Sequence, residues 1–434
     1  MEKLLRDPVH DIIAFDRSIP EDALLLAALD CAEVQRLRRI KQLGMAHMAY
    51  QGAEHSRFAH SVGVLHLIRR MLERLTRDNP VDKKIKLATM LAGLLHDLGH
   101  GPFSHVMEKF FNEHHEVWTQ RVILDPGTEI NAVLRSYSED LPQLVIKLLD
   151  GEAQPAWLNS LISSQMDADR FDYLLRDSHM TGVKYGIFDL ERLLLLLRVS
   201  EDGDKIVVAA KGVLPVEKYL QSRYQMYRQV YFHKTVTSAE AMLMAVLSRA
   251  RDLAAEGDVC CVDPGSPLHK LLHRDEINVE EFLGLDDAVL LSAMGLWSKC
   301  DDAILADLSS RLLNRRLFKS LEIQTDDEED MLFNTRLNAA RDYLENAGLD
   351  FRYYLRFSRS SDTPYRPYGS TRDGSGAIWI QSATDPAELD DIKDVSPTIK
   401  AFTESPYTII RAFFPDKAPD GHDLREQLTA ILRG

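Results

Sequence analysis

The fold of this chain is decided by one stretch of sequence, Leu94-Leu95-His96-Asp97-Leu98-Gly99-His100-Gly101-Pro102-Phe103-Ser104-His105. An apolar run at helical spacing ends here in an adjacent histidine and aspartate, and a glycine–proline corner follows that holds two further histidines. Imidazole and carboxylate groups together suit a divalent transition metal whose other coordination positions are left for oxygen ligands. An isolated His-Asp pair is often only a structural hydrogen bond, but the flanking helix, the turn and the additional histidines favour a metal site.

Size and composition exclude several other classes of protein. The 434 residues allow two or three domains, or one large core with an appendage, and the net charge of −15 argues against nucleic acid as the main partner. The 4 cysteines show neither a metal-ligand spacing nor a disulfide framework. The N-terminus has no signal-peptide core, and no apolar run is long enough to span a bilayer. We therefore expect a cytoplasmic protein without a membrane partner.

The pattern of apolar residues predicts a mainly α fold with an appended mixed region. Residues 1–20 have little helical period and read as an extended arm, and helical spacing then continues from Glu21 to about Ser320. A β-branched segment at 205–209 interrupts the helices as a short strand. After residue 320, β-rich runs at 321–324, 351–357, 377–380 and 408–413 alternate with turns. We predict two domains, 1–320 and 321–434, of which the second is a smaller α+β unit.

An adjacent histidine and aspartate cannot enclose a metal alone, because neighbouring helical residues project about 100° apart. Other helices must supply the remaining ligands. His60 lies in a candidate helix whose small residues favour close packing, and the segment Met166–Leu175 carries three carboxylates around an apolar stripe. Spacing alone does not choose among Asp167, Asp169 and Asp172 as the ligand.

Several of the remaining polar residues have ordinary structural interpretations. His66 is expected to be structural, and one residue of the His114-His115 pair is expected to serve as a helix cap. Asp172 and Asp177 are expected to form ion pairs, for example with Arg170 or Arg176, rather than to bind metal.

The order of His60, His96-Asp97 and Asp169 resembles the H…HD…D signature of the HD-domain metal-dependent phosphohydrolases. Longer segments are similar to the deoxynucleoside triphosphate (dNTP) triphosphohydrolases, in the branch that contains the vertebrate SAM-and-HD-domain enzyme and its bacterial relatives. These segments are 35–44, 57–61, 96–105 and 167–172. The match runs from about Asp7 to Lys319 and includes no SAM domain, which favours the bacterial type. The resemblance implies a multi-helical HD-domain core with a smaller α+β C-terminal domain.

The resemblance also implies a reaction and a ligand set. Family members cleave between the deoxyribose 5′-oxygen and the α-phosphorus of a dNTP, which gives a deoxynucleoside and intact inorganic triphosphate. Their metal ligands fall here on His60, His96, Asp97 and Asp169. The sequence leaves the divalent metal open among Mn, Fe, Zn, Ni and Mg, with Mg least suited to histidine ligands.

Four further residues match the family's catalytic positions. The leaving 5′-alkoxide needs a proton, and a histidine of near-neutral pKa is a suitable acid. His115 matches the histidine to which this task is attributed, and Glu108 matches its carboxylate partner. His100 and His105 are expected to line the phosphates.

Substrate binding is expected to use cations and aromatic rings, because an acidic protein must place its positive charge locally. Arg57 and Arg170 match phosphate contacts. Tyr173 and Tyr231 match residues that wall in the deoxyribose, where an aromatic wall would exclude a 2′-hydroxyl. Gln42 and Leu43 match positions near the sugar and base. Without the resemblance, each of these residues could be an ordinary packing residue.

A second nucleotide site is implied for regulation. Asp30, Gln35 and Arg38 match the family's guanine-reading triplet, and Lys3 matches a phosphate contact on the N-terminal arm. Further cations that match an activator site at an oligomer interface are Arg192, Lys211, Arg315 and Lys319. The resemblance thus implies an activator nucleotide and a homo-oligomer, with a tetramer favoured. Without it, the basic residues between 36 and 41 could equally be a solvated helix face.

Two alternatives to a dNTP triphosphohydrolase stay open at this point. The same metal site would serve a phosphodiesterase or 5′-nucleotidase that acts on another nucleotide or on a nucleic-acid end. The protein could instead be a nucleotide-sensing oligomer with little turnover. Phe232 and Tyr227 replace glutamine and histidine of the vertebrate pattern, so the preferred base is not predicted.

Overall fold

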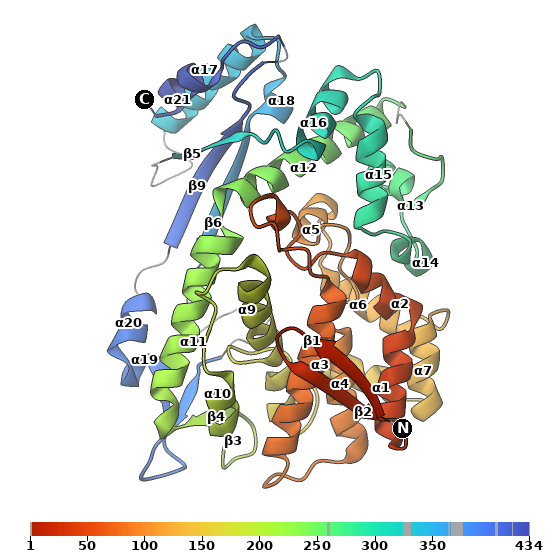
Figure 1. Cartoon of the computed structure of the whole chain (residues 1–434), viewed down its shortest axis with the longest axis vertical. Helices are drawn as coiled ribbons and strands as arrows, with labels where there is room; N and C mark the ends of the chain where they lie inside the picture. Colours follow the sequence, from red (N-terminus) through yellow and green to blue (C-terminus); the bar gives the residue numbers. More distant parts are fainter. Residues whose placement is uncertain are drawn as a thin grey trace.

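The computed structural model describes residues 2–257, 261–323, 331–362, 365, 376–403, 407–418 and 420–433. The chain is mainly helical, and a smaller region of mixed helices and strands follows the helical part (Figure 1), which confirms the predicted fold class. Within the described ranges, no helix combines the length and the apolar character that crossing a bilayer requires.

The N-terminal arm is a β-hairpin. Strands β1 (Glu2–Asp7) and β2 (Asp11–Asp16) pair antiparallel, with Glu2 opposite Asp16 and Asp7 opposite Asp11. Alternation along β2 buries Ile13 and Phe15 against the helical core. The hairpin therefore lies on the helices as a docked element, and the extended conformation predicted for this arm is confirmed.

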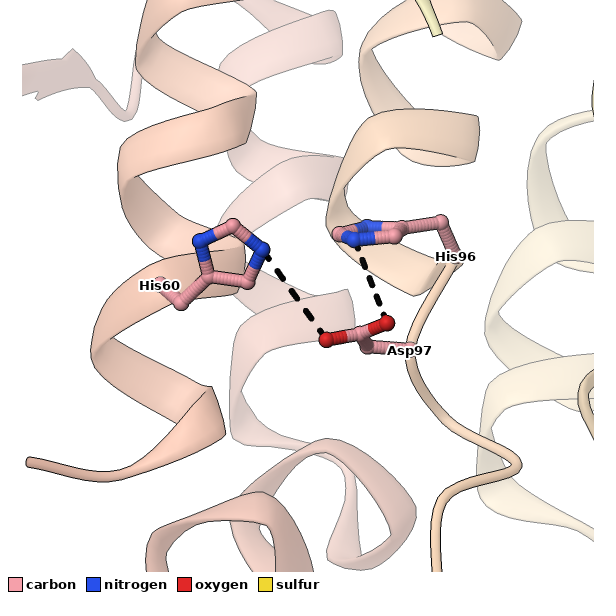
Figure 2. Close-up of side chains that lie close together, drawn as sticks. All are labelled: His60, His96 and Asp97. Carbon is pink, nitrogen blue, oxygen red and sulfur yellow. Dashed lines mark ion pairs between the residues drawn. The ribbon is translucent and has the colours of Figure 1, made fainter. Parts of the chain in front are cut away.

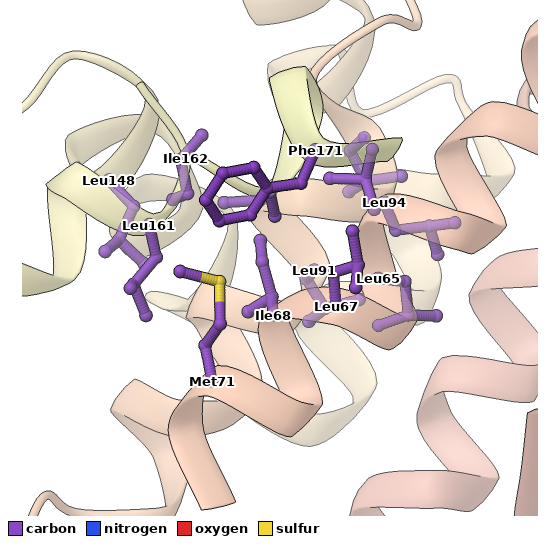
Figure 3. Packing of buried hydrophobic residues seen from close by; sticks show 14 of the residues in the cluster. Leu65, Leu67, Ile68, Met71, Leu91, Leu94, Leu148, Leu161, Ile162 and Phe171 are labelled. Atoms are coloured by element: carbon purple, nitrogen blue, oxygen red, sulfur yellow. The ribbon is translucent and has the colours of Figure 1, made fainter. Parts of the chain in front are cut away.

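Three helices form the centre of the helical core: α3 (Arg57–Leu75), α4 (Lys83–Leu95) and α9 (Ala168–Thr181). Helix α4 begins where the Asp82 carboxylate accepts a hydrogen bond from the amide of Lys84, and α9 begins where Asp167 accepts one from the amide of Arg170. Side chains from these helices interdigitate in a core with no solvent access, as Figure 3 shows for Ile68, Leu91 and Phe171. This packing sets the relative positions of the helix ends that carry the candidate ligands.

Further helices surround this centre. They are α1 (Pro20–Asp30), α2 (Ala32–Arg36), α5 (His105–Phe111), α6 (His115–Leu124), α7 (Glu129–Tyr137), α8 (Leu141–Leu149), α10 (Leu190–Leu196), α11 (Val213–Met226) and α12 (Lys234–Ala255). Short helical turns are η1 (Leu37–Arg39), η2 (Ala46–Met48), η3 (Ala156–Leu161), η4 (Ala210–Gly212) and the π-helical η5 (Tyr227–Tyr231).

A second core forms around the long helix α12. Helices α13 (Pro267–His273) and α16 (Ala303–Leu313) pack on it, α15 (Asp287–Trp297) packs on α16, and α14 (Val279–Leu283) lies beside α6. To the left of these helices in Figure 1 lies an antiparallel sheet of order β5-β9-β6, made of β5 (Lys319–Ile323), β9 (Tyr407–Phe414) and β6 (Arg356–Asp362). It is accompanied by α17 (Met331–Asn346), α18 (Phe351–Tyr354) and α21 (Arg425–Arg433).

A small four-stranded sheet joins distant parts of the chain. Its order is β3-β4-β7-β8, with β3 (Leu197–Val199), β4 (Ile206–Ala209), β7 (Trp379–Gln381) and β8 (Leu389–Asp391). Strands β4 and β7 pair in parallel, and α19 (Ile392–Val395) and α20 (Pro397–Thr403) follow β8.

Most of the predicted strands exist, with one error. The strands expected near 205–209, 321–323, 377–380 and 408–413 are confirmed as β4, β5, β7 and β9, and residue 324 lies outside the described residues. The run 351–357 was predicted as β throughout, but its first half is the helix α18, which Asp350 caps by accepting a hydrogen bond from the amide of Arg352. The division into domains at residue 320 stays a prediction; that position lies inside β5.

Candidate metal centre

The four predicted metal ligands come together from three helices. His60 projects from α3, His96 and Asp97 follow directly after α4, and Asp169 lies in the first turn of α9. His60 Nε2 lies 2.9 Å from Asp169 Oδ1 and 3.9 Å from Asp97 Oδ2, and His96 Nε2 lies 3.3 Å from Asp97 Oδ1. Figure 2 shows both imidazole rings turned toward the Asp97 carboxylate between them.

The hydrogen bonds of the two imidazoles favour metal binding through their Nε2 atoms. His60 Nδ1 lies 2.8 Å from Asp172 Oδ2, and His96 Nδ1 lies 2.8 Å from the carbonyl oxygen of Gly93. An acceptor at Nδ1 holds the proton there and directs the lone pair of Nε2 toward the centre of the site. Both Nε2 atoms are buried without a hydrogen bond of good geometry among the described residues. Two such nitrogens facing two carboxylates fit a divalent metal ion.

Charge at the site is arranged to favour a cation between the carboxylates. Burial alone would raise the pKa of Asp97, but Arg57, His96 and His100 outweigh burial and hold that pKa well below its usual range. Burial likewise would lower the pKa of His60, but its contacts with Asp169 and Asp172 raise it to about 10. The carboxylates around His60 therefore stabilise a positive charge, which a metal ion at Nε2 would supply in place of a proton.

The three carboxylates on α9 have different roles, which spacing could not separate. Asp169 faces the histidines, whereas Asp167 caps the helix and lies 3.2 Å from Arg170 Nε. Asp172 accepts two hydrogen bonds from Arg176, which confirms the ion pair expected for this carboxylate.

A cluster of three histidines around Glu108 adjoins the ligands. Glu108 Oε1 lies 2.9 Å from His100 Nδ1 and 3.0 Å from His115 Nδ1, and Glu108 Oε2 lies 3.6 Å from His105 Nδ1. The rings of His100 and His115 stack with centroids 3.9 Å apart, and His100 Nε2 lies 3.3 Å from Asp97 Oδ1. The metal group and the histidine cluster thus form one continuous polar site.

These histidines differ in exposure and therefore in what each can do. His100 is buried, and burial together with Arg57 and His115 lowers its pKa to about 3, so that ring is neutral near pH 7. The His115 side chain is 24% exposed and that of His105 is 70% exposed. His115 and His105 can therefore meet a ligand from solvent.

The glycine–proline corner after the ligands is strained and is held by a distant carboxylate. Phe103 and Ser104 both adopt positive φ, at 49° and 46°. Asp287 accepts hydrogen bonds from the amides of Phe103 (2.8 Å) and Lys41 (3.0 Å), and Ser104 Oγ accepts one from Arg57 Nε (2.9 Å). Sequence reasoning missed Asp287, because no local pattern links it to a corner 184 residues earlier.

Two tyrosines predicted to contact the sugar lie against each other, and one of them, Tyr173, follows Asp169 by one turn of α9. The rings of Tyr173 and Tyr231 lie 6.1 Å apart, and the Tyr231 hydroxyl donates a 2.8 Å hydrogen bond to Asp177. Asp177 also binds His55 Nε2 at 2.7 Å, so His55, rather than Arg170 or Arg176, is its ion-pair partner. Gln42 leaves its buried Oε1 without a partner among the described residues.

The predicted regulatory residues lie at separate places on the chain. Gln35 Oε1 accepts a 2.8 Å hydrogen bond from Arg38 Nε, whose guanidinium lies over the Phe58 ring, while Asp30 and Lys3 are exposed at the end of α1 and on β1. Arg192 on α10 and Lys211 in η4 are exposed, far from α16 in Figure 1.

Arg315 and Lys319 line a cavity of about 960 Å³ between the end of α16, β5 and α21. Most of its charged lining residues are basic: Lys234, Arg311, Arg315, Arg316, Lys319, Lys417, Arg425 and Arg433. The acidic residues in the lining are Asp307 and Asp416.

A helical core with this ligand arrangement defines an HD-domain phosphohydrolase, a metal-dependent class. The HD domain family matches residues 57–177, and the HD associated region matches residues 188–259. The chain is 38% identical over 416 residues to the uncharacterized protein YwfO of Bacillus subtilis, covering 95% of this chain and 92% of that protein. The chain belongs to the HD-domain phosphohydrolase family.

Other relatives are more distant or cover less of their own length. A deoxynucleoside triphosphate triphosphohydrolase SAMHD1 homolog from Dictyostelium discoideum is 30% identical over 262 residues, which is 56% of this chain and 49% of that protein. The crystal structure of a phosphohydrolase from Bacteroides thetaiotaomicron is similar at a TM-score of 0.81 and 29% identity, and the match covers 95% of this chain and 100% of that one.

Proposed function

We propose that this protein hydrolyses dNTPs to deoxynucleosides and inorganic triphosphate, with a divalent metal held by His60, His96, Asp97 and Asp169. The observation that carries the proposal is the continuity of the ligand group with the histidines around Glu108, since His100 Nε2 lies 3.3 Å from Asp97 Oδ1. That continuity supports a mechanism in which a histidine donates a proton beside a metal-bound phosphate. Relatives named as dNTP triphosphohydrolases support the choice of substrate.

In this proposal each group near the ligands has a defined task. A bound divalent metal would supply Lewis-acid polarisation of the α-phosphate. Arg57, oriented by Asp97 and Ser104, brings a fixed positive charge next to the phosphates. His115 turns Nδ1 to Glu108, so its Nε2 is left to deliver a proton to the leaving 5′-oxygen. Glu108 holds the His115 ring in the orientation that this step requires.

Deoxyribose selection is assigned to the tyrosine wall. The Tyr231 hydroxyl already donates its proton to Asp177, so it has no free hydrogen-bond donor to offer the sugar. A 2′-hydroxyl against such a surface would lose its hydrogen bonds to water without replacement. We therefore expect dNTPs to be preferred over the corresponding ribonucleotides.

We also propose activation by a guanine or other nucleotide within a homo-oligomer, with a tetramer favoured. The cations expected to bind activator nucleotides at the oligomer interface lie far apart in a single chain, on α10 and after α16 (Figure 1). Residues so far apart could meet one nucleotide only across a boundary between subunits. The basic cavity around Arg315 and Lys319 supports an anionic ligand there. We place the protein in the cytosol, where its dNTP substrates occur.

The test is to incubate the metal-supplemented protein with each dNTP and Mn²⁺ or Mg²⁺, with and without GTP or dGTP. We expect deoxynucleoside and triphosphate, and no turnover after His96→Ala or Asp97→Ala. His114→Ala is the matched control, because this exposed histidine adjoins His115 and has no role in the proposed chemistry.

Other products would point to the alternatives. Appearance of dNMP and pyrophosphate, or equal turnover of ribonucleotides without an activator, would instead indicate a phosphodiesterase or nucleotidase. A nucleotide-dependent change of mass without turnover would indicate a sensing oligomer.

A further inference from the structure

A buried chain of hydrogen bonds connects the N-terminal hairpin to a metal ligand. His10, in the turn between β1 and β2, places Nε2 2.6 Å from Asp172 Oδ1. The other oxygen of the same carboxylate, Oδ2, lies 2.8 Å from His60 Nδ1. The His10 side chain is 2% exposed and those of Asp172 and His60 are 0% exposed, so water does not compete for these contacts.

A second connection runs in parallel through Arg176. Its Nε and one terminal nitrogen donate to the two oxygens of Asp172, at 2.8 and 2.9 Å, and its other terminal nitrogen donates to Asp7 Oδ2 at 2.9 Å. The second oxygen of Asp7 accepts hydrogen bonds from the amides of Val9 and His10 and thereby shapes the hairpin turn. Asp172 is thus held at once by its own helix, by the hairpin and by His60.

The Asp172 carboxylate is closely packed against α3. A Cβ atom at Gly63 of α3 would lie 1.8 Å from Asp172 Oδ1 and 2.5 Å from an Arg176 nitrogen, so the absence of a side chain at Gly63 creates the space that the pair fills. On the other side, the His66 ring lies against His10 with centroids 5.4 Å apart. Movement of the hairpin turn must therefore change the contacts of Asp172.

We propose that Asp172 is a positioning residue that couples docking of the N-terminal hairpin to metal binding at His60. Asp172 fixes the tautomer and orientation of His60, and His10 and Asp7 with Arg176 fix Asp172. Removal of a residue that forms a hydrogen bond to a metal ligand typically weakens metal binding 10- to 100-fold. By linkage, metal binding must stabilise the docked hairpin by the same factor by which docking strengthens metal binding.

The first test measures Mn²⁺ affinity of the full-length, metal-depleted protein by calorimetry, without nucleotide. We expect His10→Ala to weaken Mn²⁺ binding about 10-fold and Asp172→Asn to weaken it about 10- to 100-fold. Arg6→Ala is the matched control, because Arg6 lies on the same hairpin and pairs with exposed Asp11, away from Asp172. Unfolding curves identify any variant that does not fold, and His10→Ala decides the outcome if Asp172→Asn fails.

The second test measures hydrogen exchange of the hairpin amides in the presence and absence of saturating Mn²⁺. We expect Mn²⁺ to raise hairpin protection in the wild-type protein by the fold-change seen in affinity, and we expect His10→Ala to abolish that gain. Wild-type affinity in His10→Ala, hairpin exchange indifferent to Mn²⁺, or failure of the wild-type protein to bind Mn²⁺ would each overturn the coupling. The inference rests on the metal site of the proposed function, but neither test uses a dNTP. A protein that passes both tests and hydrolyses no dNTP would refute the proposed substrate alone.

Discussion

Gly99 offers a sharp test of how the metal loop and the histidine cluster are held together. The loop 96–101 lies directly on the first turns of α6: the Gly99 amide donates a 2.9 Å hydrogen bond to Thr119 Oγ1, which itself donates to the carbonyl of His96 at 3.0 Å. A Cβ atom at Gly99 would lie 1.9 Å from the carbonyl oxygen of His115 and 2.4 Å from the amide nitrogen of Thr119. Both obstacles are backbone atoms, which cannot turn aside as a side chain can.

The required displacement follows from these distances. Real Cβ atoms essentially never approach closer than 3.0 Å, so Gly99→Ala must separate the loop from α6 by at least 3.0 − 1.9 = 1.1 Å. His115 is the first residue of α6 and would move with it, away from Asp97 and His100. A misplacement of about 1 Å in a catalytic group can cost about 100-fold in rate, and overpacking costs about 1–3 kcal/mol of stability.

The assay compares Gly99→Ala with Gly101→Ala in dNTP turnover and in urea unfolding. Gly101 lies in the same loop, but a Cβ atom there meets only Met107 Cβ, at an ordinary 3.7 Å. We expect Gly99→Ala to lose about 100-fold in kcat and about 1–3 kcal/mol, and Gly101→Ala to stay within about threefold of the wild type. Near wild-type turnover and stability in Gly99→Ala would show that contact between loop and helix does not set the position of His115.

Three further predictions concern stability and reactivity away from the ligands. Burial, together with neighbouring cations, lowers the pKa of His66 to about 4, below its unfolded value of about 6.5, so native stability should fall as the pH drops from 6.5 to 4. Between pH 7 and pH 4.5, the free energy of unfolding of His66→Gln should fall by about 2 kcal/mol less than that of the wild type, after allowance for solvent screening. Urea unfolding at the two pH values measures this difference. Burial first, and then nearby carboxylates, raise the pKa of Cys31 to about 12. Iodoacetamide at pH 8 should therefore label exposed Cys261 at least about 100-fold faster than Cys31, as followed by peptide mass spectrometry. Equal labelling rates would contradict the burial of Cys31. Tyr365→Phe should cost about 1–3 kcal/mol, because its buried hydroxyl donates to Asp391 and accepts from a backbone amide, and an unchanged midpoint in urea would exclude that role.

Local sequence patterns predicted the helices and the ligand types because both depend on residues that lie close together in the sequence. Apolar spacing defined α4, and an adjacent histidine and aspartate at its end marked the metal loop. Asp169 was different: three carboxylates fall between residues 167 and 172, and the packing of α9 on α3 brings Asp169 to Nε2 of His60 and Asp172 to its Nδ1. Resemblance to a family supplied that choice, whereas spacing did not.

Contacts between distant segments could not be predicted in this way. His10 meets Asp172 across 162 residues, and Asp287 meets Phe103 across 184 residues. In the sequence, His10, Asp172 and Asp287 look like ordinary charged or polar residues, because the role of each depends on which elements the fold brings together. The helix α18 was missed for a local reason, because Phe351 and the tyrosines after it have strand propensity and only the Asp350 cap favours a helix.

The parallel pairing of β4 with β7 has a consequence for how relatives of this protein can be recombined. Val207 and Val208 of β4 lie opposite Trp379 and Ile380, so a segment beyond residue 375 completes a sheet that begins before residue 210. Removal of the chain after residue 320 would leave β4 paired with β3 alone, so that its other edge and its buried valines would be exposed, which is a template for aggregation. The C-terminal region is therefore not an exchangeable module. In a chimera joined at a single point, the donor's C-terminal region would have to pair correctly with the recipient at two strands, β5 and β4.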